Sequence, residues 1–368
     1  MKVLIVSVSF YPEVSPRSFR TTELVKEFCR QGHEVVLAGL EADGRQEIQK
    51  EYGFRWLGLG KGDWNKAFQW MVRKGGIWRL LSGAMGWFLE FPHLEWYFQI
   101  PRKLKSSETF DLIISIAVPY TVHWGVNRAI RKGNINGKVW VADCSDPFML
   151  DVLRIRKVPF YFASFEKSFC RRANYLSVPL EGSKDGYYPE FREKIRVIPQ
   201  GFHFEKEREN LPAFQKNDIL TFVFAGQLLQ KGRNPQRLLE FLSASDRNFR
   251  FYIFTYQKYL VTPFIKEGDK RFVLCDIVPR DEVMKFMRSC DFLINIMNST
   301  PMQMPSKLID YYIIDRPVFN MKSDELLEDD LSILKQFLDG DYSGRFEFVG
   351  MEKFQISNVV EKFIELAQ

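Results

Sequence analysis

The sequence predicts an α/β protein made of two doubly wound domains that face a central cleft. Short apolar, β-branched runs alternate with amphipathic helical segments along the chain, which is typical of parallel βαβ units. A polar segment at 209–218 interrupts this alternation once and is interpreted as a linker between the domains. Ligands of such sheets bind at the carboxyl ends of the strands, so the cleft between the domains is the expected site.

The elements follow in the same order in both halves. The first half predicts strands at 2–8, 33–40, 111–117, 138–144, 174–179 and 194–201, and helices at 19–31, 120–132 and 160–173. The second half predicts strands at 219–226, 249–255, 271–278, 291–296 and 316–320, and helices at 234–245, 280–290 and from 305. We therefore expect Rossmann-like domains at 1–203 and 204–350, and a final helix within 351–368 that crosses back to the first domain.

Composition favours a globular cytoplasmic protein. The chain has 368 residues, of which 46% are hydrophobic and 27% charged. No run of eighteen apolar residues predicts a membrane span, and the N-terminus lacks the pattern of a signal peptide. The five cysteines are scattered without CxxC spacing, which indicates reduced thiols and no zinc site.

Positive charge is concentrated in a tryptophan-rich segment at 54–105. This segment holds nine basic residues, three acidic residues and six of the eight tryptophans. It suits peripheral contact with an anionic membrane, at the inner face in a cytoplasmic protein. The alternative is that the aromatic side chains form the core of the first domain and a helical lid. No recognised nucleic-acid-binding module is present, so nucleic acid is not expected as a partner.

Three loops in the second half carry features of a phosphate-binding site. They are AGQLLQKGRNP (225–235), CDIVPRD (275–281) and STPMQMPSKLID (299–310), and each follows a predicted strand. Glycine allows close approach, lysine and arginine supply charge, and a helix that begins at Pro-Ser-Lys offers free N–H groups. Because parallel strands end at one edge of a sheet, the three loops are expected to converge. For Pro-Ser-Lys alone, the alternative is a capped helix without a ligand.

Several stretches, in the same order along the chain, resemble glycosyltransferase family four, which has the GT-B fold. The similar stretches include SPRSFRTTELVKEFCRQGHEV, VADCSDPF, KIRVIPQGF, FAGQLLQKGRNP and MPSKLIDYYIIDRPV. The resemblance implies a retaining transfer of a sugar, of the hexosyl type, from a nucleotide-sugar donor to a hydroxyl of a glycan or lipid-linked acceptor. It also places the acceptor in the first domain and the donor in the second, and implies a role in polysaccharide biosynthesis.

The resemblance assigns roles to individual residues. It implies a donor site made of Gly226, Gln227, Lys231, Arg233, Asp276, Ile277, Pro305, Ser306, Lys307, Leu308 and Asp310. Lys231 would contact the diphosphate, and Asp310 stands where the family has a glutamate that binds the ribose. His123 and Asp143 are predicted to join Lys231 as catalytic residues. Arg17, Arg20 and Asp146 are predicted to bind the acceptor; the alternatives are solvated arginines and turn carboxylates.

Two departures from the family pattern keep other functions open. Met302 stands where the first of two glutamates is expected, and Gln227 stands where an arginine is usual. The alternatives are a non-catalytic, membrane-docked nucleotide-sugar-binding protein and a nucleotide-sugar epimerase of the same architecture. The DGD at 339–341 is interpreted as a turn, so no metal and no cofactor are expected. A dehydrogenase is disfavoured because no GxGxxG follows the first strand.

Overall fold

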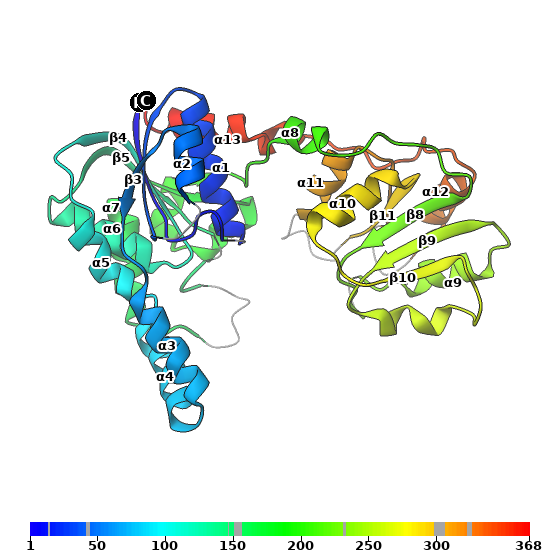
Figure 1. The fold of residues 1–368 in the computed structure, drawn as a ribbon, viewed down its shortest axis with the longest axis horizontal. Helices are drawn as coiled ribbons and strands as arrows, with labels where there is room; N and C mark the ends of the chain where they lie inside the picture. The colour runs from blue at the N-terminus through cyan, green and yellow to red at the C-terminus, as the bar shows by residue number, and fades with distance from the viewer. Residues whose placement is uncertain are drawn as a thin grey trace. The chain divides into compact units, whose positions relative to one another are not determined.

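The chain folds into two compact units, which are described separately. The computed structural model describes residues 1–13, 15–41, 45–145, 147–150, 157–230, 233–297, 306–321 and 326–368. Unit 1 comprises Met1–Phe202 and Glu352–Gln368, and unit 2 comprises His203–Met351. Each unit contains one parallel sheet flanked by helices (Figure 1).

The sheet of unit 1 is parallel and has the order β3-β2-β1-β4-β5-β6-β7. Its strands are β1 (Lys2–Val6), β2 (Glu34–Gly39), β3 (Arg55–Gly58), β4 (Thr109–Ile116), β5 (Asn136–Asp143), β6 (Tyr175–Val178) and β7 (Ile195–Val197). The chain runs outward from β1 to β3 and then from β4 to β7 on the other side. The order therefore reverses between β1 and β4, as in a doubly wound sheet.

Helices cover both faces of this sheet. They are α1 (Pro16–Arg30), α2 (Arg45–Tyr52), α5 (Glu95–Lys103), α6 (Thr121–Arg131), α7 (Phe162–Arg172) and α13 (Ile356–Glu365); α3 (Asp63–Lys74) and α4 (Gly76–Leu89) instead project from the sheet (Figure 1). Side chains alternate along β1: Leu4 and Val6 join one apolar cluster, and Val3 and Ile5 join the cluster on the opposite face. Both faces of the strand are thus buried.

The C-terminal helix belongs to the core of unit 1. Its residues Val359, Val360 and Phe363 are buried in the cluster that also holds Leu24 and Phe28 of α1. The backbones of Phe202 and Gln355 form a parallel bridge just before this helix. The last segment of the chain therefore contributes to a core whose other residues lie at least 150 positions earlier in the sequence.

Unit 2 repeats the same plan with a smaller sheet, ordered β10-β9-β8-β11-β12 and also parallel. Its strands are β8 (Leu220–Ala225), β9 (Phe249–Phe254), β10 (Phe272–Cys275), β11 (Phe292–Ile296) and β12 (Val318–Met321). Its helices are α8 (Phe204–Glu209), α9 (Gln236–Ala244), α10 (Arg280–Ser289), α11 (Ser306–Ile314) and α12 (Glu328–Leu338). Here the order reverses between β8 and β11. The two parallel, doubly wound sheets confirm the predicted fold class.

Short 3₁₀ segments complete the list, at Glu181–Gly186, Pro189–Lys194, Lys258–Leu260, Thr262–Phe264 and Met351–Phe354. Two strands are much shorter than expected: the strand predicted at 271–278 ends at Cys275, and the strand predicted at 194–201 ends at Val197. Ile198 still donates to the carbonyl of Val178, but Pro199 has no N–H with which to continue the ladder.

Candidate functional site

Gly226 and Lys307 come together where the strand order of unit 2 reverses. Gly226 directly follows β8, and Lys307 lies in the first turn of α11, the helix that follows β11. The Lys307 ammonium donates a hydrogen bond to the carbonyl of Ala225, the last residue of β8, and lies 5.0 Å from the ring centroid of Phe224. Ligands of doubly wound sheets bind at this reversal point.

The glycine makes room for the lysine. A Cβ atom added at Gly226 would lie 1.2 Å from the Lys307 nitrogen, and the φ angle of Gly226 is +153°, which side chains rarely adopt. Any other residue at position 226 would therefore displace the ammonium from the end of β8.

The environment of Lys307 does not fully compensate its charge. Burial and, to a smaller extent, the Arg233 guanidinium lower the pKa of Lys307, the Asp310 carboxylate opposes both effects, and the net pKa is about 8. Within the described residues, the Nε of Arg233 is buried and has no hydrogen-bond partner. A buried donor without an acceptor costs roughly 1–3 kcal/mol, so a bound anion would satisfy this group.

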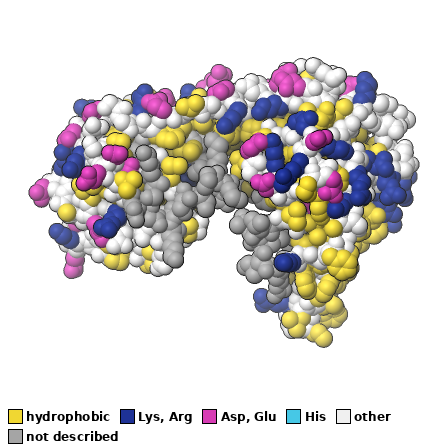
Figure 2. Space-filling model, turned by 180° about the vertical axis from the view of Figure 1, so that it is seen from behind, with side chains coloured by type: hydrophobic (Ala, Val, Ile, Leu, Met, Phe, Trp, Pro, Cys, Tyr) yellow, Lys and Arg dark blue, Asp and Glu magenta, His cyan; other side chains and the backbone are white. Residues whose placement is uncertain are grey.

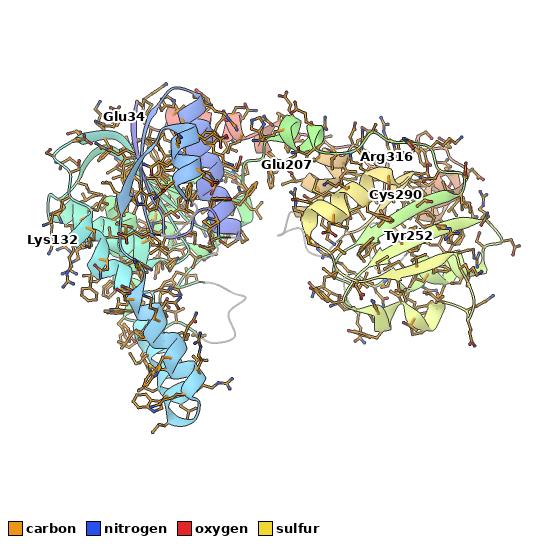
Figure 3. The ribbon with its side chains drawn as sticks, in the orientation of Figure 1. Glu34, Lys132, Glu207, Tyr252, Cys290 and Arg316 are labelled. Carbon is orange, nitrogen blue, oxygen red and sulfur yellow. The ribbon has the colours of Figure 1, made fainter. Side chains whose placement is uncertain are left out.

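Asp310 lies one turn further along α11 and is held by Arg280 of α10. The Arg280 guanidinium donates to one Asp310 oxygen from Nε at 3.0 Å and from Nη2 at 2.6 Å, and to Glu207 of α8 at 2.8 Å. Glu207 is labelled in Figure 3. Burial raises the pKa of Asp310, and Arg280 offsets this only in part. The carboxylate is thus positioned but incompletely neutralised.

Arg280, Lys307 and Asp310 border a cavity of about 260 Å³ in unit 2. It is lined by Ala225, Gly226, Phe254, Ile277, Val278, Arg280, Val283, Met284, Met287, Lys307, Asp310 and Tyr311. The apolar side chains supply its walls, and the charged groups are Arg280 at the start of α10 and Lys307 and Asp310 on α11. Such a cavity can hold an apolar ring beside an anionic group.

The structure brings together part of the predicted donor site. Gly226, Ile277, Lys307 and Asp310 line the cavity, and Arg233 lies close enough to shift the pKa of Lys307.

Three other predicted donor residues lie outside the cavity lining. Gln227 is exposed, Leu308 is half-buried, and Asp276 is exposed and paired with Lys258 at 2.6 Å. Lys231, Pro305 and the side chain of Ser306 lie outside the described residues.

The contribution of α10 to the cavity of unit 2 was not predicted from the sequence. Arg280, Val283, Met284 and Met287 all face the cavity. Their spacing of three and four residues within the predicted helix at 280–290 was a usable signal for one helical face. What the pattern lacked was a reason for that face to meet a ligand instead of the core.

In unit 1, Arg20 and Asp143 form a buried ion pair. The Arg20 side chain donates to both Asp143 oxygens, at 2.9 and 2.8 Å, and to the carbonyls of Ile198 and Pro199. Ser177 donates to Asp143 at 2.6 Å. Burial alone would raise the pKa of Asp143, but the charge and hydrogen bonds of Arg20, the charge of Arg17 and the hydrogen bond from Ser177 together outweigh it, and the pKa is lowered. This differs from the expected acceptor contact of Arg20, because its guanidinium is already occupied within unit 1.

His123 is also buried. Its Nδ1 lies 2.7 Å from the Ser115 hydroxyl, which accepts a hydrogen bond from the Trp140 indole at 2.9 Å, and its Nε2 lies 3.7 Å from the Cys144 sulfur. Burial lowers the pKa of His123 to about 3 despite the Asp143 charge. His123 is therefore neutral at physiological pH and has no exposed surface.

Arg17 lies half-buried in the first turn of α1. The Arg17 charge contributes, less than burial does, to the lowered pKa of His123. Arg17 therefore lies near the carboxyl end of the sheet of unit 1. Asp146 lies outside the described residues. Of the predicted acceptor residues, Arg17 is thus the one whose side chain is described and only partly buried.

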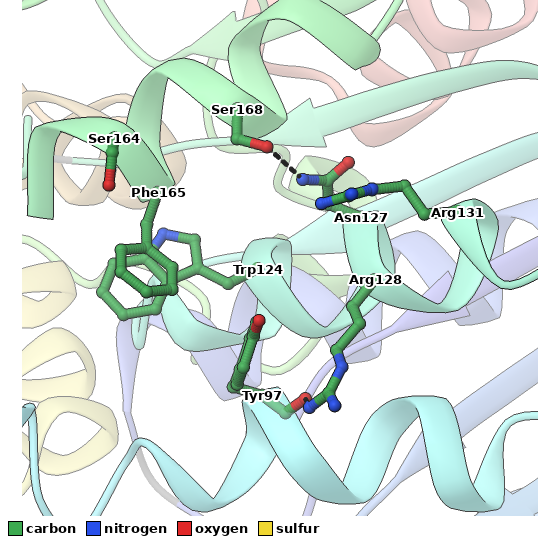
Figure 4. A pocket seen from close by; sticks show the side chains of 8 residues that line it. All are labelled: Tyr97, Trp124, Asn127, Arg128, Arg131, Ser164, Phe165 and Ser168. Atoms are coloured by element: carbon green, nitrogen blue, oxygen red, sulfur yellow. Dashed lines mark hydrogen bonds between the residues drawn. The ribbon is translucent and has the colours of Figure 1, made fainter.

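A second, smaller cavity of about 160 Å³ lies in unit 1 beside α5, α6 and α7 (Figure 4). Its lining combines aromatic rings with polar groups from Asn127, Arg128, Arg131, Ser164 and Ser168. Asn127 donates to Ser168 at 2.9 Å, as drawn in Figure 4. The Arg128 guanidinium stacks 4.7 Å from the centroid of Tyr97, which links α6 to α5. The cavity thus marks a helix–helix junction.

Among the residues that the structure describes, no group of three or more His, Cys, Asp or Glu side chains is placed to hold a metal ion. Over the same residues, no helix combines the length and apolar character needed to cross a membrane.

Comparison with known proteins identifies the fold. No family model matches the chain, and no curated protein matches it in sequence. Solved structures do match along the whole chain. A glycosyltransferase from Rickettsia africae ESF-5 has a TM-score of 0.61 and 12% identity, with 100% of this chain and 97% of that chain covered.

Two further structures show the same likeness. The lipopolysaccharide outer core galactosyltransferase WaaB has a TM-score of 0.57 and 12% identity, covering 100% of this chain and 99% of its own. HepE from Anabaena, in complex with UDP and glucose, has a TM-score of 0.53 and 11% identity, covering 99% and 98%. The structural neighbours are thus glycosyltransferases of the GT-B fold. Membership in family four stays a prediction.

Proposed function

We propose that this protein is a glycosyltransferase that moves a sugar from a nucleotide-sugar donor to a hydroxyl of a glycan or lipid-linked acceptor. One observation carries the proposal: a partly desolvated ammonium, Lys307, is seated over a glycine at the strand-order reversal of unit 2, near Arg233, whose Nε has no partner among the residues that the structure describes. This arrangement suits a diphosphate. The likeness to glycosyltransferase structures supports the same reading.

In this proposal each part of the donor meets a matching part of the cavity. Lys307 and Arg233 hold the diphosphate together with the N–H groups at the start of α11, where the helix dipole favours an anion. The resemblance adds Lys231 to this set. Asp310, fixed by Arg280, accepts from the ribose hydroxyls. The apolar wall that includes Ile277 borders the base.

The proposed reaction breaks the bond between the anomeric carbon and the diphosphate oxygen, and forms a bond from that carbon to the acceptor oxygen. The nucleoside diphosphate leaves with the bonding electron pair, and its released oxygen takes up the proton that the acceptor hydroxyl loses. Fixed cations near the leaving oxygen stabilise the developing charge. We propose retention of the anomeric configuration, on the strength of the resemblance.

The buried positions of His123 and Asp143 favour a positioning role in this proposal. Neither side chain reaches solvent in unit 1. Arg17 and Asp146 remain the proposed acceptor contacts, and Lys231 the proposed catalytic contact to the diphosphate. The proposed acceptor is part of a growing polysaccharide.

Product analysis tests the proposal. The protein is incubated with radiolabelled UDP-, GDP-, ADP- and CDP-sugars and a membrane extract as the acceptor pool, and products are resolved by mass spectrometry. We expect label in a larger product, release of the nucleoside diphosphate, and loss of both in Lys307→Met but not in Lys285→Met, an exposed lysine of α10. Nuclear magnetic resonance of the new linkage tests retention.

Two results would overturn the proposal. An epimerised free nucleotide sugar without any acceptor product would indicate an epimerase. Tight binding of a nucleotide sugar with no turnover of any acceptor in the extract would indicate the non-catalytic binding protein.

A further inference from the structure

Helices α3 and α4 form a hairpin that projects from the sheet of unit 1 (Figure 1). They are joined at Gly75 and Gly76, whose φ angles of +68° and +51° turn the chain. At the base, the buried Glu95 carboxylate of α5 accepts from the backbone N–H groups of Asp63 and Trp64, at 3.2 and 3.0 Å. The side chain of another helix thus caps α3, so the hairpin is fixed to the unit at this end.

Aromatic contacts strengthen the same base. Trp64 and Phe68 pack against Phe91, with ring centroids 5.8 and 6.0 Å apart. The Trp87 indole donates to the carbonyl of Lys157 at 3.1 Å. The hairpin therefore has a firm attachment, and its remaining surface needs another explanation.

That remaining surface is apolar and uncovered. The sequence of α4 is GIWRLLSGAMGWFL, and its one buried residue is Ser82; in α3 the one buried residue is Met71, and the structure describes every residue of both helices. Ile77 and Leu80 are each 75% exposed. The other exposed large apolar side chains of the hairpin are Trp70, Val72, Trp78, Leu81, Trp87, Phe88 and Leu89. A helix that is apolar on all sides is normally buried.

The apolar surface continues beyond the hairpin. Phe160 is 86% exposed, and the hydroxyl of the neighbouring Tyr161 donates to the carbonyl of Phe88 at the end of α4. Figure 2 shows hydrophobic side chains gathered on this projecting part, with basic side chains among them. The surface thus extends along α4 to the loop before α7.

Beyond Asp63 at its base, which pairs with Lys66 at 3.1 Å, the charges on the hairpin are all positive. Residues 64–89 contain Lys66, Arg73, Lys74 and Arg79 and no acidic residue. The Lys74 ammonium lies 4.7 Å from the ring centroid of Trp70 and 5.4 Å from that of Trp78. Long basic side chains beside tryptophan rings are typical of the boundary between lipid tails and anionic headgroups.

We propose that the α3–α4 hairpin docks unit 1 onto an anionic lipid bilayer. Its fourteen-residue α4 is about 21 Å long at 1.5 Å per residue, too short to span the hydrocarbon layer, so the hairpin lies in the interface. A second copy of the chain fits less well, because each hairpin would bring the same uncompensated positive charge. A bilayer also accounts for exposure on several sides of α4, where a protein groove would cover one stripe. The inference goes beyond the proposed function and does not depend on it.

Vesicle flotation tests this inference in the intact protein. The vesicles are phosphatidylcholine alone, or phosphatidylcholine mixed with phosphatidylglycerol. We expect binding to the anionic vesicles, weakened about tenfold or more by the double variant Ile77→Asp/Leu80→Asp, which removes two apolar contacts with the lipid. The double variant Arg73→Glu/Lys74→Glu is expected to lose about tenfold or more on anionic vesicles. Both sites are exposed, so the fold has little to lose.

The matched control is Val349→Asp/Tyr259→Asp, which changes two exposed apolar residues of unit 2. It is expected to bind as the wild type does, and circular dichroism checks that all variants fold alike. Two results would overturn the inference. One is that the folded wild-type protein floats with neither kind of vesicle, or that the folded Ile77→Asp/Leu80→Asp variant binds vesicles as well as the wild type does. The other is a concentration-dependent dimer, seen by sedimentation, that this double variant dissociates while vesicle binding is absent.

Discussion

The two units each hold a cluster of opposite charges near a strand end, and the clusters differ in how completely they are satisfied. In unit 1, Arg20 and Asp143 have side-chain exposures of 4% and 1%, and every hydrogen bond of the pair is directed to the protein. In unit 2, Lys307 and Asp310 line a cavity, and the neighbouring Arg233 Nε lacks a partner among the described residues. The first cluster is closed, and the second is open to a ligand.

The pKa shifts show the same contrast. In the closed cluster the charges of Arg20 and Arg17 and the hydrogen bonds to Asp143 together outweigh burial and lower the pKa of Asp143. In the open cluster burial prevails: it raises the pKa of Asp310 and lowers that of Lys307. Incomplete compensation is typical of sites that receive a charged ligand. We therefore infer that the closed cluster stabilises unit 1 and the open cluster binds.

The largest expected effect is on the closed cluster. Arg20→Ala leaves the buried Asp143 carboxylate without its partner and should lower the free energy of unfolding of unit 1 by about 3–5 kcal/mol. Chemical denaturation measures the change. As a control, Arg192→Ala removes one partner of the exposed pair with Asp185 and should change it by less than about 1 kcal/mol. Equal effects of the two variants would contradict the contrast.

The next effect concerns the seat of the ammonium. Gly226→Ala forces a Cβ onto the Lys307 nitrogen and should weaken binding of a nucleoside diphosphate by roughly tenfold to a hundredfold, as expected for losing a charge-assisted hydrogen bond. Gly268→Ala is the matched control, because Gly268 also has a positive φ of +80° but nothing within 4 Å of an added Cβ. Isothermal titration calorimetry measures both. Equal affinity in the two variants would contradict a role in binding for the seat of Lys307 at Gly226.

A smaller effect follows from the pKa of Lys307. Affinity for a nucleotide sugar, whose diphosphate does not titrate near neutrality, should be constant below about pH 8 and fall above it as the ammonium loses its proton. The fall should approach about tenfold per pH unit. Lys307→Met should remove this slope. A wild-type affinity that stays level to pH 10 would contradict the assignment.

The smallest effect is on the stability of unit 2. The pKa of Lys307 is lowered on folding, so between about 8 and its ordinary value of 10.5 the unfolded chain holds more protons, and stability rises with pH. Below this window Lys307→Met removes a buried cation and should leave the free energy of unfolding within about 1 kcal/mol, or raise it. A loss of unfolding free energy as large as that caused by Arg20→Ala, measured by the same denaturation assay, would indicate a structural role for Lys307.

Local patterns in the sequence predicted every strand of the two sheets except β3, the four-residue edge strand Arg55–Gly58. Apolar runs such as 2–8 and 219–226 correspond to β1 and β8, and the alternation with helices predicted two parallel sheets. The helical hairpin was harder to predict. The tryptophan-rich segment allowed either a core or a lipid-facing surface, because the composition of α4 is the same in both cases. The exposure of the α4 side chains, which depends on the fold, distinguishes a lipid-facing surface from a core.

The site was predictable in its parts but not in its pairings. Gly226, Lys307 and Asp310 stood in recognisable loops, and the structure brings them to one cavity. The contact of Lys307 with Ala225 joins residues 82 positions apart, and no local pattern encodes it. Arg20 illustrates the opposite difficulty. As a sequence feature it resembles an anion-binding arginine, but its partner Asp143 lies 123 positions away and occupies it.

The central claim is that the cavity of unit 2 binds a nucleoside diphosphate through Lys307. The most direct measurement is calorimetric titration of the folded protein with uridine, guanosine, adenosine and cytidine diphosphates and their sugars, repeated with Lys307→Met and with Lys285→Met. We expect selective, saturable binding of the nucleotides of one base, lost in Lys307→Met and kept in Lys285→Met. Absence of binding to every nucleotide in the panel, or equal binding by Lys307→Met, would contradict it.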